Sequence, residues 1–152
     1  MSDNTSATTT LNTLIATTID SINGYEDSAS NIDNQRFAQI FRERANERQQ
    51  IVEQLRAEVR RLGGNPEDDG SFLGKTHQRF VDLKAAITGR DEKSIINEVE
   101  RGEDYLKEKW QAALQSGDLD GETHTLVERL YQQIKQGHDQ MSQLKHGMET
   151  QA

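Results

Sequence analysis

The sequence predicts an all-α fold, a bundle of four long helices with one shorter helix between the second and the third. Apolar residues recur at steps of three and four in five separate segments, which is the spacing of one helical face. The 152 residues include one proline, Pro66, so long helices meet little obstruction. A hydrophobic content of 32% beside a charged content of 29% fits narrow apolar stripes on exposed helices. This length fits one domain.

The first predicted helix covers about residues 10–30. Residues 1–9 are polar and rich in serine and threonine, so we expect them to form a disordered tail. The stripe of the helix consists of Leu11, Leu14, Ile15, Thr18, Ile22, Tyr25 and Ala29.

The second predicted helix has clear signals at both ends. It begins at Asp33 or Asn34, both of which are good N-cap residues. It ends at Gly63-Gly64-Asn65-Pro66, where glycine adopts the left-handed conformation and proline forbids continuation. Its stripe runs from Phe37 to Leu62.

Three further helices follow a loop at residues 67–70. The shorter one lies between Ser71, a potential N-cap, and Gly89, a stop signal. The third long helix runs from a cap at Asp91 to about Ser116, and the fourth from Leu119 or Asp120 to about His146. With Gly147 as a stop, the predicted bundle spans residues 10–147 and a tail spans residues 148–152.

The short helix decides between two topologies. It is long enough to carry the chain back along the bundle, which would make the second and third long helices parallel. A bundle with one such crossover has the ferritin-like topology. The alternative is an up-down bundle with the short helix packed across one end. The sequence favours the crossover, which makes the fold class a ferritin-like four-helix bundle with an extra short crossover helix.

Ionisable residues interrupt the apolar stripes of three helices. Arg44 and Arg48 interrupt the second long helix, Glu103 the third and His138 the fourth. A rise of 1.5 Å per residue puts these positions at similar depths in the crossover topology, with Arg44 about a turn from the other three. A buried charge is costly unless it is paired or bound to a metal. The layer therefore holds either an ion-pair network or a metal site.

In the first interpretation the layer is structural. Arg48 pairs with Glu103 or Glu100 between parallel neighbouring helices, Arg44 adds a second cation, and His138 takes a further hydrogen bond. Such layers add little net stability but fix the register of helices. We favour this interpretation because the two arginines supply the positive charge that a metal would otherwise provide.

In the second interpretation the layer binds a metal. Di-iron bundles use two glutamates and two Glu-x-x-His pairs, and this pattern is incomplete here. Oxygen ligands with one histidine suit iron or manganese. The candidate ligands are Glu103, His138, Glu100, Glu47 and either Asp20 or Glu26.

Composition and motifs narrow the function. A net charge of −8 disfavours nucleic-acid binding, because an acidic surface repels phosphates. Neither a membrane-spanning apolar run nor a secretory signal is present, which predicts a cytoplasmic protein. The absence of cysteine excludes thiolate sites. With no phosphate loop or nucleophile motif, the sequence favours a noncatalytic protein. Amphipathic helices leave monomer and homo-oligomer open.

Several segments also resemble a known family. LRAEVRRLGG at Leu55–Gly64, LKAAITG at Leu83–Gly89 and ERGED at Glu100–Asp104 carry the resemblance. By these motifs the chain resembles an uncharacterised family of bacterial ferritin-like four-helix-bundle proteins, over nearly all of its length after about residue 10. The resemblance implies a ferritin-like bundle, iron binding and a loose association with stress responses. It implies no catalytic residues, and the missing Glu-x-x-His pairs depart from true ferritins.

Overall fold

Four helices make up the computed structural model, which describes residues 4–68 and 92–150. They are α1 (Thr5–Asn31), α2 (Gln35–Arg61), α4 (Glu92–Gln115) and α5 (Gly121–Thr150). The described residues contain no strand, so the all-α class is confirmed. The predicted short helix between Ser71 and Gly89 lies outside the described residues.

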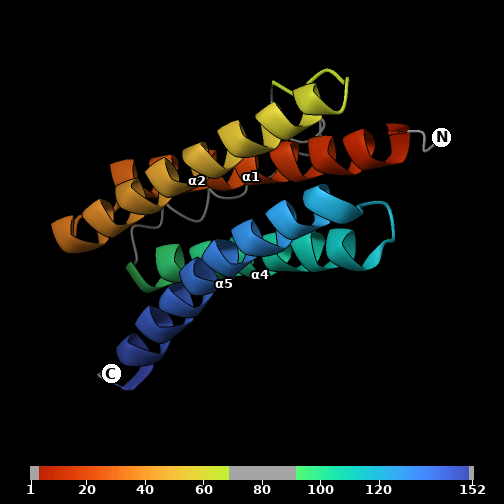
Figure 1. Ribbon diagram of the computed structural model, residues 1–152. Coiled ribbons are helices and arrows are strands. Elements are labelled where there is room, and N and C mark those ends of the chain that lie inside the picture. The colour runs from red at the N-terminus through yellow and green to blue at the C-terminus, as the bar shows by residue number, and fades with distance from the viewer. Residues whose placement is uncertain (1–3, 69–91, 151–152) are drawn as a thin grey trace.

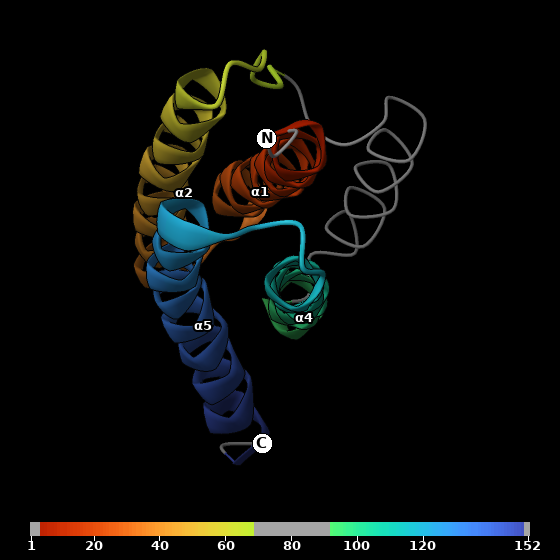
Figure 2. The same cartoon turned by 45° about the vertical axis from the view of Figure 1, so that its right-hand side comes forward.

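The four helices form two antiparallel pairs. Figure 1 shows α1 and α2 running in opposite directions, as do α4 and α5, whereas α2 and α4 run in the same direction. In Figure 2, α1 lies between α2 and α4, and α5 lies beside both α4 and α2. Helices α2 and α4 are therefore diagonal to each other, and a side chain that joins them must cross the middle of the bundle.

The ends of α2 follow their local signals. The side chain of Asn34 accepts hydrogen bonds from the backbone N–H groups of Arg36 and Phe37, at 3.0 and 3.3 Å. At the other end Gly63 has φ of +86°, a conformation that favours glycine. Gly64 N–H then donates to the carbonyl of Val59 at 2.9 Å. Of the two predicted N-cap residues, Asp33 and Asn34, the structure uses Asn34, and the predicted glycine stop is confirmed.

Helix α1 begins at Thr5, five residues before the predicted start. Its first turn packs on the end of α2, so close that a Cβ on Gly64 would lie 2.9 Å from Cγ2 of Thr8. Asn4 Nδ2 also donates to the carbonyl of Leu62 at 3.3 Å. Tertiary contact therefore extends the helix into a segment whose own composition favours disorder. At the other end of the chain, α5 continues through Gly147 to Thr150, past its predicted stop.

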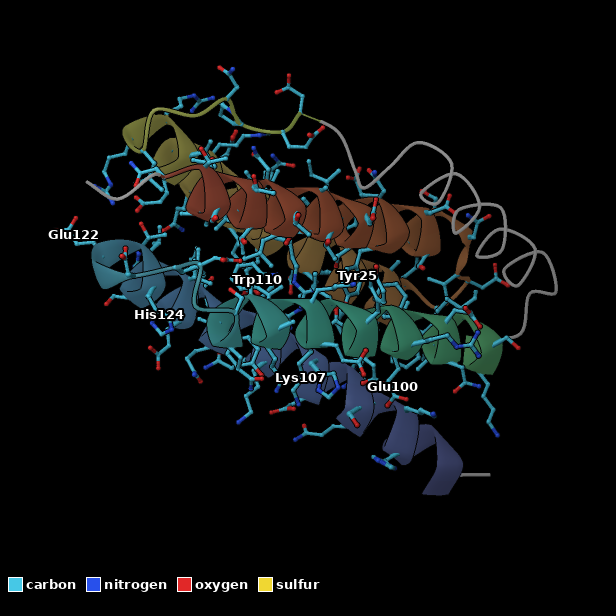
Figure 3. The ribbon with its side chains drawn as sticks, turned by 90° about the vertical axis from the view of Figure 1, so that its right-hand side faces the viewer. Tyr25, Glu100, Lys107, Trp110, Glu122 and His124 are labelled. Atoms are coloured by element: carbon cyan, nitrogen blue, oxygen red, sulfur yellow. The ribbon has the colours of Figure 1, made fainter. Side chains whose placement is uncertain are left out.

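The core is apolar from the middle of the bundle toward each of its two ends. Five consecutive residues of α1, Leu14–Thr18, are buried, so the helix is covered on all sides over this segment. Trp110 of α4 is fully buried and donates from Nε1 to Oγ1 of Thr18 at 3.3 Å. Figure 3 shows Trp110 and Tyr25 in the space between α4 and α1. No helix among the described residues is apolar over a stretch that could cross a bilayer.

Candidate functional site: a buried ion pair

The structure brings Arg48 of α2 and Glu103 of α4 together in the middle of the bundle. Nη2 of Arg48 donates to Oε2 of Glu103 at 2.9 Å, and Nη1 donates to Oε1. The two side chains are 0% and 1% exposed. A bidentate pair of this kind is the strong form of an arginine–carboxylate contact. It spans the diagonal of the bundle and therefore links the two parallel helices directly.

Helix α1 supplies two more groups to this ion pair. Nη1 of Arg48 donates to Oγ of Ser21 at 2.7 Å. The guanidinium lies over the ring of Tyr25, 5.5 Å from the ring centroid, in a cation–π geometry. The Tyr25 ring in turn packs against Phe41 with centroids 5.7 Å apart. The buried pair is thus enclosed by polar and aromatic partners on one side.

The electrostatics of the cluster keep Arg48 and Tyr25 each in one protonation state. Burial alone would lower the pKa of Arg48, but the charge and hydrogen bonds of Glu103 outweigh it and raise that pKa. Burial, and then the negative charge of Glu103, raise the pKa of Tyr25 well above its usual value. Arg48 is therefore charged and Tyr25 neutral at physiological pH. Groups held in this way are poor proton donors or acceptors near neutral pH.

Gly137 brings α5 against the arginines, and sequence reasoning missed it. A Cβ on Gly137 would lie 2.6 Å from Nη2 of Arg48 and 3.0 Å from Nε of Arg44. The two guanidinium groups therefore occupy the space that any other residue would need. The signal was available, because a glycine in the middle of a long helix costs about 1 kcal/mol and needs a packing reason.

Arg44 belongs to the rim of the layer and does not contact Glu103. Its Nη1 donates to Oε1 of Glu47 at 2.8 Å, and its Nη2 donates to Oε1 of Gln140 on α5. Arg44 therefore uses a second carboxylate and an amide, while Glu103 is left to Arg48.

His138 bridges two aspartates and makes no hydrogen bond or ion pair with Glu103. Nε2 is 2.6 Å from Oδ1 of Asp104 on α4, and Nδ1 is 3.1 Å from Oδ1 of Asp139. The histidine side chain is 15% exposed. The pKa of Asp139 is lowered, chiefly by its hydrogen bond to His138. The predicted approach of Glu103 and His138 to one metal is not what the structure shows.

The remaining candidate ligands are also dispersed. Glu100 accepts from Nζ of Lys145 at 2.8 Å, and Glu47 bonds Arg44. On α1, Asp20 is half-buried and Glu26 is exposed. Within residues 4–68 and 92–147, histidine, aspartate and glutamate side chains form no group of three or more that could hold a metal ion. The carboxylates of this layer therefore pair separately with cationic side chains and do not converge on one point.

These features define a class of protein, an all-helical bundle with a charge-neutral ion pair at its centre. A family model described as a domain of unknown function (DUF2383) matches residues 6–116. The chain belongs to this family. The matched segment contains Ser21, Tyr25, Arg48 and Glu103 and ends just after α4, so it leaves out Gly137 and the rest of α5. No curated protein matches the chain.

Proposed function

We propose that this protein is a noncatalytic, ferritin-like helical bundle that acts through self-association or partner binding, and that its buried charged layer is structural. One observation carries the proposal. Both carboxylate oxygens of Glu103 are held by one fully buried guanidinium, that of Arg48. The residue at the centre of the candidate metal site therefore already has a cation.

Charge argues against a metal at the same place. A divalent cation at Glu103 would lie beside the permanent positive charge of Arg48, in a region that water does not screen. It would also have to displace two hydrogen bonds that compensate the burial of both ions. Removing one partner of a buried pair costs about 3–5 kcal/mol. A metal would have to exceed that cost with one carboxylate as its only central ligand.

The same pair supports a structural role. It adds little stability over well-packed apolar residues, but it is satisfied in one register of α2 against α4. Ser21 and Tyr25 add α1 to that register, and Gly137 adds α5. A bundle fixed in this way presents its outer surfaces rigidly, which suits a binding protein. A relation to stress responses and a cytoplasmic location stay predictions from the sequence.

Elemental analysis tests the proposal against metal binding. Cells are grown with added iron or manganese, and the purified protein is measured beside a Glu103→Ala, His138→Ala double variant. We expect metal well below one equivalent in both proteins. A matched Glu128→Ala variant on the exposed face of α5 serves as the control. One equivalent of iron or manganese in the parent, lost in the double variant and kept in the control, would overturn the structural interpretation.

A further inference from the structure

The outward face of α2 carries a regular row of six exposed residues. The row follows steps of three and four from residue 43 to residue 60, the spacing that keeps side chains on one seam of a helix. It lies opposite the buried stripe of Phe41 and Val59. All six positions are exposed: Glu43, Asn46, Gln50, Glu53, Ala57 and Arg60. We call these six residues the α2 row.

The α2 row is complementary to itself when read in the opposite direction. If a second α2 packs antiparallel, with a two-fold axis between Gln50 and Glu53, then Glu43 faces Arg60 of the second copy. Each end of the row therefore meets the opposite charge. This ion pair occurs twice, because the two-fold axis repeats every layer.

The two amides of the row find acceptors in the same arrangement. Gln50 faces Glu53 of the second copy, so its N–H can donate to that carboxylate. Asn46 faces Ala57, whose small side chain leaves room for the amide, and lies one layer from the same Glu53. Within its own chain Glu53 accepts from Nη1 of Arg56 at 3.2 and 3.3 Å, and a carboxylate has acceptor capacity beyond that. A polar residue such as Asn46 within a helical seam fixes register at a cost in stability.

The charged ends of the row are available for this contact. The Arg60 side chain makes no hydrogen bond or ion pair with other described residues. Glu43 accepts a hydrogen bond from Gln39 at 3.2 Å and also has further acceptor capacity. Neither residue would have to break an ion pair in order to meet the second copy.

We propose that the α2 row is a docking surface for a second copy of this chain, in an antiparallel α2–α2 contact. The inference rests on the proposed function, of which it specifies the self-associating form. The row is about 26 Å long, and only Ala57 among its residues is apolar. Such a contact falls at the small end of interface sizes, and exposed ion pairs are screened by salt. The dimer is therefore weak and weakens further as salt rises.

Cysteine cross-linking tests the register, because the chain has no cysteine of its own. Asn46→Cys protein is mixed with Ala57→Cys protein under mild oxidation. We expect a covalent dimer in the mixture. Either variant alone should cross-link much less, because its two cysteines would lie about 16 Å apart along the seam, beyond the reach of a disulfide. The control is Ala112→Cys at an exposed position of α4. Equal cross-linking of the control, or none in the mixture, would overturn the proposed contact.

Charge reversal separates this surface from self-association in general. Sedimentation equilibrium at low salt should show a dimer that Glu43→Arg or Arg60→Glu weakens at least several-fold. The variant with both reversals should recover it, while Glu108→Arg on α4 should leave it unchanged. If none of the three row variants changes dimerisation, the α2 row is not the contact surface, although the proposed function still stands. If the parent protein is monomeric at every concentration, both the α2 contact and self-association are wrong. Partner binding is then the remaining form of the proposed function.

Discussion

Helix α2 meets α1 and α5 through two very different contacts. Its contact with α1 is the more extensive and includes the ring of Phe41 against that of Tyr25, and Val52 and Leu55 of α2 are fully buried in the apolar core. Against α5 it makes polar contacts, including Glu58 with Thr123 at 2.6 Å and Arg129 with Gln54 at 3.4 Å. Figures 1 and 2 show α5 diverging from α2 toward its C-terminal end. One helix thus has a firmly packed side and a loosely joined side.

The two contacts are expected to contribute to stability in different ways, one through apolar burial and the other through hydrogen bonds. Apolar burial contributes roughly 25 cal/mol for each square ångström removed from water, whereas a polar contact contributes about 0.5–1.5 kcal/mol net. The α1–α2 contact should therefore set most of the stability, and the α2–α5 seam should fix orientation. Local opening should begin where α5 leaves α2, because regions with few buried apolar contacts open first.

The largest expected effect comes from the apolar side. Phe41→Ala removes a fully buried ring that packs on Tyr25, and should lower the free energy of unfolding by about 3–5 kcal/mol. Thr123→Ala on the polar side is the matched variant, because it removes one short hydrogen bond to Glu58 and should cost about 0.5–1.5 kcal/mol. Urea denaturation measures both. Similar losses in the two variants would contradict the division between the two sides.

For the buried ion pair, replacing one partner should lower the free energy of unfolding much more than replacing both. Glu103→Ala leaves Arg48 charged and unpaired in the core, which should cost about 3–5 kcal/mol. Replacing both partners, as Arg48→Met with Glu103→Leu, should restore most of that loss because no charge is left buried. Denaturation of the three proteins measures the coupling. A double variant as unstable as the single one would mean that the pair contributes stability as well as register.

Gly137 tests how tightly the polar seam is packed. Gly137→Ala should lower stability by about 1–2 kcal/mol, since the added Cβ meets two guanidinium groups that other contacts hold in place. Gly102→Ala on α4 is the control, because its Cβ would meet nothing within 4 Å. That substitution should raise stability by about 0.5–1 kcal/mol through helix propensity alone. If both variants gain stability in thermal melts, the arginines are free to move and the seam is looser than its geometry indicates.

The sequence predicts those parts of this molecule whose signals are local. A cap at Asp33 or Asn34 and the stop at Gly63 follow from local residues, and Arg48 and Glu103 stand out because they interrupt apolar stripes. The start of α1 depends on contact between Thr8 and Gly64, which are 56 residues apart in the sequence and have no local signal.

For His138, the sequence predicts the position along the bundle but not the bonding partner. Its level in the bundle matches that of Glu103, but its partner is Asp104. Neighbouring residues on a helix point about 100° apart, so Asp104 lies at the rim while Glu103 points inward. Depth along the bundle follows from residue numbers, whereas the choice between adjacent carboxylates depends on the rotation of two packed helices, which the sequence alone does not supply.

The smallest effect concerns the acid sensitivity of the polar seam. Hydrogen bonds from Arg61, and then from Thr123, hold the pKa of Glu58 below its ordinary value of 4.5. A lowered carboxyl pKa in the folded state gives stability that is present above pH 4.5 and is lost as pH falls through the folded pKa. Glu58→Gln should therefore make the free energy of unfolding depend less on pH below about pH 4.5. The loss of stability relative to the parent protein should be largest at neutral pH. Glu53→Gln, at a more exposed carboxylate on the same helix, is the matched control. Chemical denaturation across this pH range measures both, and an unchanged acid profile in Glu58→Gln would show that the seam gains nothing from this ionised carboxylate.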